Sequence, residues 1–191
     1  KNNESQYLTL ENKLRIGISY LRLVDKSFVK YSDIDKIHRD SAIFYFKDVI
    51  SANSANKDIT ILKSKAYHNL SGIYIRDSLY DLAEKNTLKF LELTKSVKDQ
   101  ISIAHGYNSL FNISFAKKEY EKSKIFLNKG LDAIKKIKGI KADEIRAALN
   151  LNFAYSAYML KDYKNAYDYQ EKSWDLYDRL KDLEHEKDIA D

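Results

Sequence analysis

The 191-residue chain contains no cysteine and no proline, and it has only five glycines. Without cysteine it can form neither disulfide bonds nor thiolate metal sites, and it has no thiol for nucleophilic catalysis. Because proline interrupts helical hydrogen bonding and glycine loosens a helix, the scarcity of both favours long helices. A run of about 18 apolar residues, the length that crosses a bilayer, is also missing, so the sequence predicts no membrane-spanning segment.

The chain does contain enough apolar material for a core, together with a modest excess of positive charge. Apolar residues make up 44% of the chain, charged residues make up 32%, and the net charge is +5. Acidic residues are interleaved with the lysines almost everywhere, which weighs against a nucleic-acid surface. The densest basic stretch, "KKIKGIK" (residues 135–141), is interpreted as a helix end that Gly139 terminates. We predict no direct binding of nucleic acid, and a nucleic-acid binder is the weakest of three alternatives.

A tyrosine followed three residues later by a small residue recurs along the chain. The occurrences lie 40 and then 43 residues apart, at Tyr80-x-x-Ala83, Tyr120-x-x-Ser123 and Tyr163-x-x-Ala166. Each follows a matching aromatic and apolar block, which starts at Tyr67, Tyr107 and Phe153. A degenerate unit with "LRIGISYLRL" and "DSAIFYFKDVI" precedes them. Self-similarity of this kind is typical of repeat proteins, so the sequence predicts four helix pairs.

The spacing of apolar residues and of helix-start residues places eight helices. We expect them at residues 5–25, 35–53, 58–76, 79–97, 100–117, 120–138, 142–160 and 163–187. Side chains that accept backbone N–H bonds mark the expected starts, at Ser32–Asp33, Asp58, Ser78, Asp99 and Asp143. Two helix axes approach closely only where side chains are small, so we expect Ser71 and Gly72 to pack against Ala83. One pair cannot bury its apolar faces alone, whereas stacked pairs cover each other.

The blocks "YHNLSGIY…YDLA" and "LNFAYSAYMLKDYKNAYDY" resemble the tetratricopeptide repeat (TPR). The block "YNSLFNIS…YEKS" is similar, with Phe111 where that motif has a small residue. The motif's closing proline is missing, and the period exceeds the usual value of about 34 residues. The resemblance covers residues 10–180 and implies an all-α fold, a right-handed TPR-like solenoid of about four helix pairs. The implied domains are a repeat array over 1–180, with units near 5–53, 58–97, 100–138 and 142–180, and a charged helix that starts at 181–191.

The C-terminal stretch "WDLYDRLKDLEHEKDIAD" resembles the end of the repeat region in multi-domain bacterial regulators of the Bacteroidetes type. In those regulators a charged helix leads, usually through a transmembrane segment, to a helix-turn-helix DNA-binding domain or a histidine kinase. Leu176, Leu180 and Leu183 continue an apolar stripe along this stretch. The resemblance therefore implies a downstream DNA-binding or kinase domain in the full-length chain. The first residue, Lys1, is not methionine, which indicates a processed or trimmed piece.

No pattern in the chain indicates a chemical reaction. Its four histidines, His38, His68, His105 and His185, lack the spacing of metal ligands, so we expect no metal and no cofactor. A phosphate-binding glycine loop and a G-x-S-x-G nucleophile elbow are also missing. The 15 tyrosines are interpreted mainly as packing residues. We predict that the chain is not an enzyme.

In TPR-type arrays the first helices of the pairs line a concave groove, so the resemblance also implies a ligand face. The phase of the motif assigns these residues to it: Lys65, His68, Asn69, Gly72 and Arg76; His105, Asn108, Asn112 and Phe115; and Leu151, Asn152, Tyr155 and Tyr158. His68 and His105 fall at nearly equivalent places, so we expect them to face the same groove. Amides suit a peptide backbone, cations suit carboxylates, and aromatic rings suit apolar anchors. The carboxylate clamp of chaperone-binding TPRs is not reproduced, because Gly72 stands where that clamp needs a side chain.

Two functions therefore lead the alternatives. The first is a non-catalytic sensor module of a bacterial transcriptional regulator or two-component signalling protein, which binds a peptide, a protein or a small ligand in its groove. The second is a free-standing TPR scaffold for protein–protein assembly, lipid-anchored in the periplasm. We expect the piece itself to be soluble. The identity of the ligand, the formation of a homodimer and the side of the membrane are left open.

Overall fold

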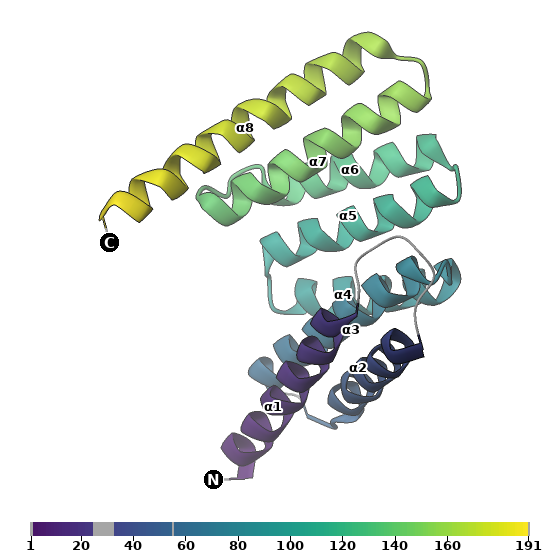
Figure 1. Cartoon of the computed structure of the whole chain (residues 1–191), viewed down its shortest axis with the longest axis vertical. Coiled ribbons are helices and arrows are strands. Elements are labelled where there is room, and N and C mark those ends of the chain that lie inside the picture. Colours follow the sequence, from purple (N-terminus) through teal and green to yellow (C-terminus); the bar gives the residue numbers. More distant parts are fainter. Residues whose placement is uncertain (1, 25–32, 55, 191) are drawn as a thin grey trace. The chain divides into compact units, whose positions relative to one another are not determined.

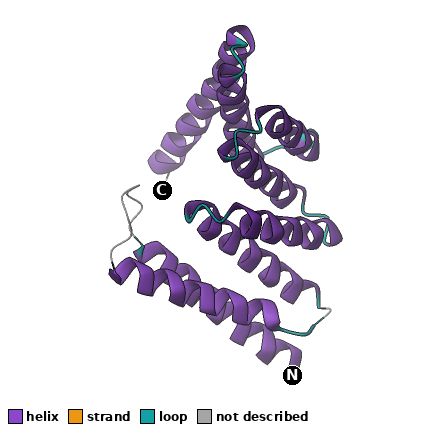
Figure 2. Ribbon diagram, turned by 90° about the vertical axis from the view of Figure 1, so that its right-hand side faces the viewer, coloured by secondary structure: helices purple, strands orange, loops and turns teal. Residues whose placement is uncertain are grey.

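The computed structural model of the chain describes residues 2–24, 33–54 and 56–190, with side chains described over 4–24, 34–54 and 56–183. These residues form eight α-helices and no strand (Figures 1 and 2). The helices are α1 (Asn2–Leu23), α2 (Asp33–Ser51), α3 (Lys57–Arg76), α4 (Tyr80–Ser96), α5 (Gln100–Ala116), α6 (Tyr120–Ile134), α7 (Ile140–Met159) and α8 (Tyr163–Ala190). The most extensive contacts join α1 to α2, α3 to α4, α5 to α6 and α7 to α8. The predicted all-α fold of four helix pairs is confirmed for the described residues.

The chain divides into two compact units, Lys1–Lys98 (unit 1) and Asp99–Asp191 (unit 2). In unit 1, α3 packs against both helices of the first pair. In unit 2, α7 packs against both α5 and α6. Each unit thus shows the contact pattern of a helical repeat, in which the first helix of one pair covers the pair before it.

The turn inside each of the last three pairs has the same backbone conformation. One residue of each turn is left-handed, with φ of 61° at Ser78, 62° at Lys118 and 61° at Lys161. The next residue's N–H donates to a carbonyl in the last helical turn, from Leu79 to Tyr74 at 2.8 Å, from Glu119 to Ser114 at 2.9 Å and from Asp162 to Ala157 at 2.9 Å. Such bonds satisfy carbonyls that a helix end leaves unpaired. The repeat is therefore present in the backbone as well as in the sequence.

The helix starts follow the predicted chemistry only in part. Asp99 caps α5 as predicted, because its Oδ1 accepts the N–H of Ser102 at 3.0 Å. At α3 the prediction is wrong: Asn56 caps the helix, and its Oδ1 accepts the N–H of Asp58 at 2.7 Å. The predicted cap at residues 32–33 lies outside the described side chains.

The predicted caps Ser78 and Asp143 are also wrong, because neither residue lies at the cap position of its helix. Ser78 belongs to the left-handed turn, so Leu79 occupies the cap position of α4 and forms no side-chain cap bond. Asp143 lies inside the first turn of α7, where its carboxylate pairs with Arg146 and with Arg179. These side chains hold α7 and α8 together instead of capping a helix.

The predicted close contact between α3 and α4 is confirmed at one of its two residues. Ser71 is buried, and its hydroxyl lies 2.6 Å from the Thr87 hydroxyl and 3.3 Å from the Ala83 carbonyl. For Gly72 the prediction is wrong, because this residue is exposed and a Cβ added there would meet nothing within 4 Å. Gly72 therefore lies on the open surface of α3 and does not determine the distance between α3 and α4.

The core of unit 2 lies where α6 meets α7. Leu127 and Ile134 of α6 and Leu149 of α7 have no exposed surface, and Phe111 of α5 joins their cluster. A Cβ at Gly130 would lie only 3.0 Å from Leu149 Cδ2, so the missing side chain lets the two helices touch. The second pair of the unit therefore completes the core of the first.

Gly139 does not end the preceding helix, contrary to the prediction. Helix α6 ends at Ile134, and Gly139 stands immediately before α7 with φ of 107° and ψ of 166°. Residues with side chains rarely adopt that conformation. A Cβ there would meet nothing within 4 Å, so any penalty for a side chain comes from the backbone alone.

Substitutions at Gly139 and Lys118 test how the backbone conformation at each turn affects stability. We expect Gly139→Ala to lower the free energy of unfolding by about 1–3 kcal/mol, because alanine is strained at that φ. Lys118→Gly removes the strain of a lysine in the left-handed conformation, which raises the free energy of unfolding by about 1 kcal/mol. Because glycine also gives the unfolded chain more conformational freedom, part of that gain is lost, and we expect little change or a small gain in stability. Urea unfolding followed by circular dichroism measures both, and an equal loss in the two variants would contradict this account.

Candidate functional site

The predicted groove residues fall into two sets, one in each unit. Unit 1 carries Lys65, His68, Asn69, Gly72 and Arg76 on α3. Unit 2 carries His105, Asn108, Asn112 and Phe115 on α5, and Leu151, Asn152, Tyr155 and Tyr158 on α7.

In unit 2 a hydrogen bond between two predicted groove residues joins α5 to α7. Asn152 Nδ2 donates to Asn108 Oδ1 at 2.6 Å, and both residues are half-buried. Each amide keeps one polar group, Nδ2 of Asn108 and Oδ1 of Asn152, that forms no hydrogen bond with another described residue. The pair therefore keeps both an unbonded donor and an unbonded acceptor, the two kinds of group that a peptide backbone requires.

Exposed side chains surround this amide pair. His105 and Asn112 lie one helical turn before and after Asn108 on α5, and both are exposed. On α7, Tyr155 is 55% exposed and Tyr158 is 61% exposed. We call this set the amide face: His105, Asn108, Asn112, Asn152, Tyr155 and Tyr158. Phe115 is half-buried instead, with its ring centroid 5.3 Å from that of Phe111 and 5.1 Å from that of Tyr120.

The amide face carries no charged side chain at neutral pH. Partial desolvation lowers the pKa of His105 below its ordinary value, although the residue lies exposed on the helix and the nearby acids Asp99 and Glu144 oppose the shift. Its imidazole is therefore neutral, and the remaining groups are amides and tyrosines. Such a surface recognises a ligand through hydrogen bonds and apolar contact and not through ion pairs.

The α3 set of unit 1 has a different character. Lys65 and Arg76 are exposed cations, whereas Asn69 donates its amide N–H to the Lys65 carbonyl at 2.8 Å. The His68 ring packs against Phe90 of α4, with ring centroids 4.9 Å apart. The 40-residue offset aligns His105 with Lys65 and not with His68, so the predicted equivalence of the two histidines is wrong.

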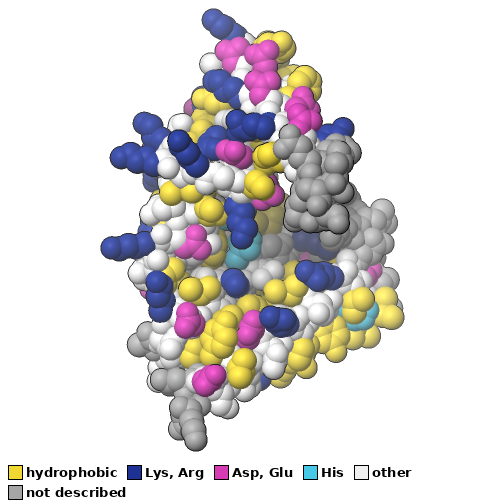
Figure 3. Space-filling model, turned by 90° about the vertical axis from the view of Figure 1, so that its left-hand side faces the viewer, with side chains coloured by type: hydrophobic (Ala, Val, Ile, Leu, Met, Phe, Trp, Pro, Cys, Tyr) yellow, Lys and Arg dark blue, Asp and Glu magenta, His cyan; other side chains and the backbone are white. Residues whose placement is uncertain are grey.

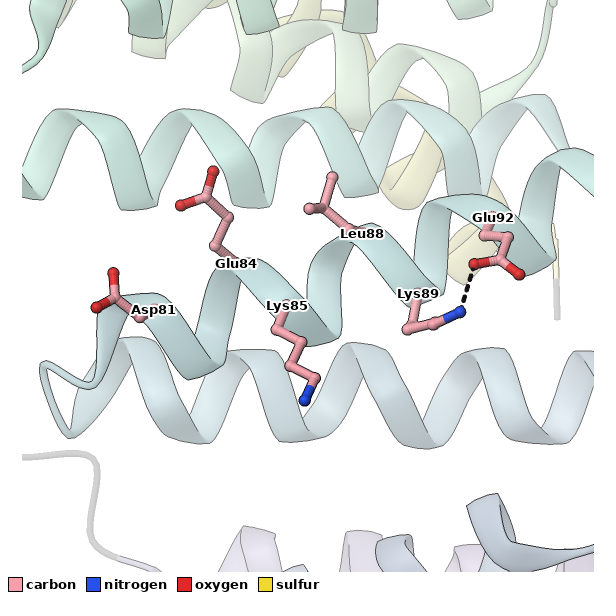
Figure 4. A pocket seen from close by; sticks show the side chains of 6 residues that line it. All are labelled: Asp81, Glu84, Lys85, Leu88, Lys89 and Glu92. Carbon is pink, nitrogen blue, oxygen red and sulfur yellow. Dashed lines mark hydrogen bonds and ion pairs between the residues drawn. The ribbon is translucent and has the colours of Figure 1, made fainter.

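Unit 1 has hollows whose lining residues are not among the predicted groove residues. One, of about 410 Å³, runs along α4 and is lined by the described residues Asp81, Glu84, Lys85, Leu88, Lys89 and Glu92 (Figure 4). Figure 4 shows Glu84 and Leu88 projecting to one side of α4 and Lys85 to the other. Lys89 Nζ lies 2.7 Å from Glu92 Oε2, an exposed pair of the kind that contributes little to stability.

The second hollow, of about 700 Å³, lies along α1. Its described lining is Asn12, Arg15, Ile16, Ser19, Tyr20 and Leu23. Ile16 is 40% exposed and Leu23 is 60% exposed, so the hollow presents an apolar strip. The run "LRIGISYLRL" contains these residues, but its periodicity alone does not tell a covered face from an open one.

Neither the face drawn in Figure 3 nor the described metal-binding side chains indicate a charged or metal-holding site. On the molecular face drawn in Figure 3, basic side chains are interspersed with acidic and hydrophobic ones. Among the described residues, no group of three or more histidine, aspartate or glutamate side chains is placed to hold a metal ion. The side chain of His185 lies outside that part of the chain. None of the helices in the described ranges has both the length and the apolar content needed to cross a bilayer.

Comparison with known proteins shows the fold. No family model matches the chain. The uncharacterized protein ycf37 of Cyanophora paradoxa is 32% identical over 97 residues, which cover 46% of this chain and 55% of that protein. The crystal structure of the apo form of RapI superimposes with a TM-score of 0.67 and 18% identity, over 93% of this chain and 58% of that one. The chain thus spans little more than half the length of either protein, and the likeness to RapI shows an all-helical repeat fold.

The pKa of His105 provides a direct test of the amide face. We expect an NMR titration to place its midpoint below 6.5, the ordinary value, with assignment by the His105→Gln variant. The pKa of His105 is lower in the folded chain than in the unfolded chain. Its contribution to the stability of the fold is therefore fully present at pH values above the unfolded pKa, and it is lost as the pH falls through the folded pKa. The urea-unfolded chain serves as the reference. A folded midpoint equal to or above the unfolded one would contradict the desolvation described here.

Proposed function

We propose that this chain is a non-catalytic interaction module that holds an extended peptide segment of a partner protein on the amide face. The hydrogen bond between Asn108 and Asn152 carries the proposal, because it fixes a free donor and a free acceptor across α5 and α7. An extended peptide presents an N–H and a C=O about every 3.3 Å, so paired amides can bond its backbone whatever its side chains. The likeness of the fold to RapI supports a helical repeat as the scaffold for this face.

The tyrosines supply the second element of recognition. Tyr155 lies one helical turn from Asn152 and leaves more than half of its surface in water. Tyr158 follows, with its ring centroid 5.8 Å from that of Tyr163 at the start of α8. Rigid aromatic side chains with a polar tip bind apolar groups at low entropic cost. We therefore assign the apolar side chains of the peptide to the tyrosines and its backbone to the asparagines.

A finer proposal makes the module the sensor of a bacterial transcriptional regulator or two-component protein. Helix α7 carries Asn152 and packs along α8, which runs for 28 residues against 20 in α7. A ligand that bridges α5 and α7 therefore acts on the helix that adjoins α8. Such a ligand changes the conformation only if it binds two arrangements with different affinity. A gene that encodes an output domain beyond this stretch would support the sensor role, and a gene without one would contradict it.

The alternative, a free-standing scaffold, rests on a separate observation. The apolar hollow along α1 lies in unit 1, whereas the amide face lies in unit 2. Two distinct surfaces of different chemistry are what a protein needs to hold two partners. Partner binding that involves Ile16 and Leu23 and is insensitive to the asparagines would favour this function.

Selection from a library of random ten-residue peptides tests the proposed face. We expect the peptides that wild-type protein enriches to lose about tenfold or more in affinity for the double variant Asn108→Ala/Asn152→Ala, because each lost hydrogen bond contributes about 0.5–1.5 kcal/mol. Fluorescence anisotropy of labelled peptides measures the affinity, and circular dichroism confirms that the variant is folded.

The matched control is Asn128→Ala, which removes an exposed amide from α6, away from the face. We expect this variant to bind as wild type does. Equal binding by all three proteins, or no enrichment over scrambled peptides, would contradict the proposal.

A further inference from the structure

Helix α8 carries an exposed stripe of aromatic side chains, which adjoins the amide face where the Tyr163 ring meets the Tyr158 ring. The members are Tyr163 (60% exposed), Tyr167 (64%), Trp174 (57%) and Tyr177 (42%). Their spacing places them on one side of the helix over four turns. Among the described helices α8 packs only against α7, which runs along one of its sides (Figure 1). We call this set the aromatic stripe.

Comparison with the equivalent positions of α6 shows that part of the aromatic stripe has no described helix over it. Trp174 and Tyr177 correspond, 43 residues earlier, to Leu131 and Ile134 of α6. Ile134 has no exposed surface and Leu131 is partly buried, because both belong to the core that α7 completes. At α8 the equivalent positions hold large aromatic residues that no described helix covers. Trp174 and Tyr177 therefore stand at positions that a following helix covers in the preceding pair.

An acidic row borders the aromatic stripe. Glu171, Asp175, Asp178 and Asp182 follow one another at intervals of four, three and four residues, so they share one edge of the helix. All four are exposed, and none forms an ion pair with another described residue. Over its whole length α8 has eight acidic and five basic residues, although the chain as a whole is basic. This edge is consequently a row of four exposed acidic side chains beside an apolar surface, on a helix whose own net charge is negative.

We propose that the aromatic stripe and the acidic row form a docking site for a basic amphipathic helix of a partner protein. The apolar face of that helix would pack on Trp174 and Tyr177, as α7 packs on the equivalent positions of α6. Its lysine or arginine residues would lie along the acidic row, where opposite charge favours the correct orientation and opposes acidic competitors. Aromatic residues with polar tips suit an interface that can also exist open to water.

The docking site adjoins the amide face at the contact between Tyr163 and Tyr158, but it rests on different observations from the proposed peptide-binding function. The amide face lies on α5 and α7 and recognises an extended backbone without charge. The docking site lies on α8 and recognises a folded helix with charge. Failure of one in its experiment therefore leaves the other unaffected.

Two synthetic helices of about 18 residues, roughly 27 Å long, test the docking site. Both carry leucine at helical spacing, and one has lysine along the flanks whereas the other has glutamate there. Trp174 is the only tryptophan in the chain, so its fluorescence reports burial of the stripe directly. We expect the lysine peptide to shift the emission to shorter wavelength and to bind at least about tenfold more tightly than the glutamate peptide, with salt weakening its binding.

Charge reversal on α8 gives the decisive variant. We expect Glu171→Lys/Asp178→Lys to weaken the lysine peptide about tenfold or more and to strengthen the glutamate peptide. The matched control, Glu121→Lys/Asp132→Lys, reverses two exposed acids of α6 and should leave both affinities unchanged. Equal binding of the two peptides, or equal effects of the two double variants, would overturn the proposal. So would concentration-dependent self-association that buries Trp174, because a second copy would then occupy the stripe.

Discussion

Within each unit, the first helix pair relies on the second pair to cover an apolar face that it cannot bury alone. In unit 2, Leu127 and Ile134 of α6 lose all contact with water because α7 lies over them. Gly130 makes this contact tight, since any side chain there would press on Leu149. Full burial of one such side chain stabilises the fold by roughly 1.5–3 kcal/mol. Stability in the unit therefore comes from the interface between pairs as much as from the pairs themselves.

The same backbone accommodates two different chemistries at the contact between the two helices of one pair. Between α3 and α4, Ser71 and Thr87 meet through hydroxyl groups 2.6 Å apart. Forty residues later, Phe111 and Leu127 hold the corresponding positions and are buried as an apolar pair. The spacing of small and aromatic residues therefore predicted the helix pairs, although individual positions departed from the expected residue type. The repeat tolerates the exchange of a hydroxyl pair for an apolar pair, because a buried contact requires only that the two side chains suit each other.

The helix ends and the site were less predictable, for physical reasons. Ser78 and Lys118 adopt left-handed conformations without being glycine, so the sequence carries no signal for those turns. The phase of the repeat placed Asn108 and Asn152 on first helices, but their mutual hydrogen bond depends on how closely α5 and α7 pack. The exposure of Trp174 likewise depends on which helix covers α8, and periodicity cannot tell a covered face from an open one.

Helix α7 connects the features of unit 2, because it covers α6, carries half of the amide pair and packs along α8. The most direct test of this account is hydrogen exchange on Leu149→Ala, with Ile125→Ala, at a residue 54% exposed on α6, as the control. The account predicts a loss of about 2–5 kcal/mol in unfolding free energy for Leu149→Ala and weaker amide protection in both α6 and α7. A loss no larger than that of the control, or protection that falls only in α7 and α8, would contradict the dependence of one pair on the next.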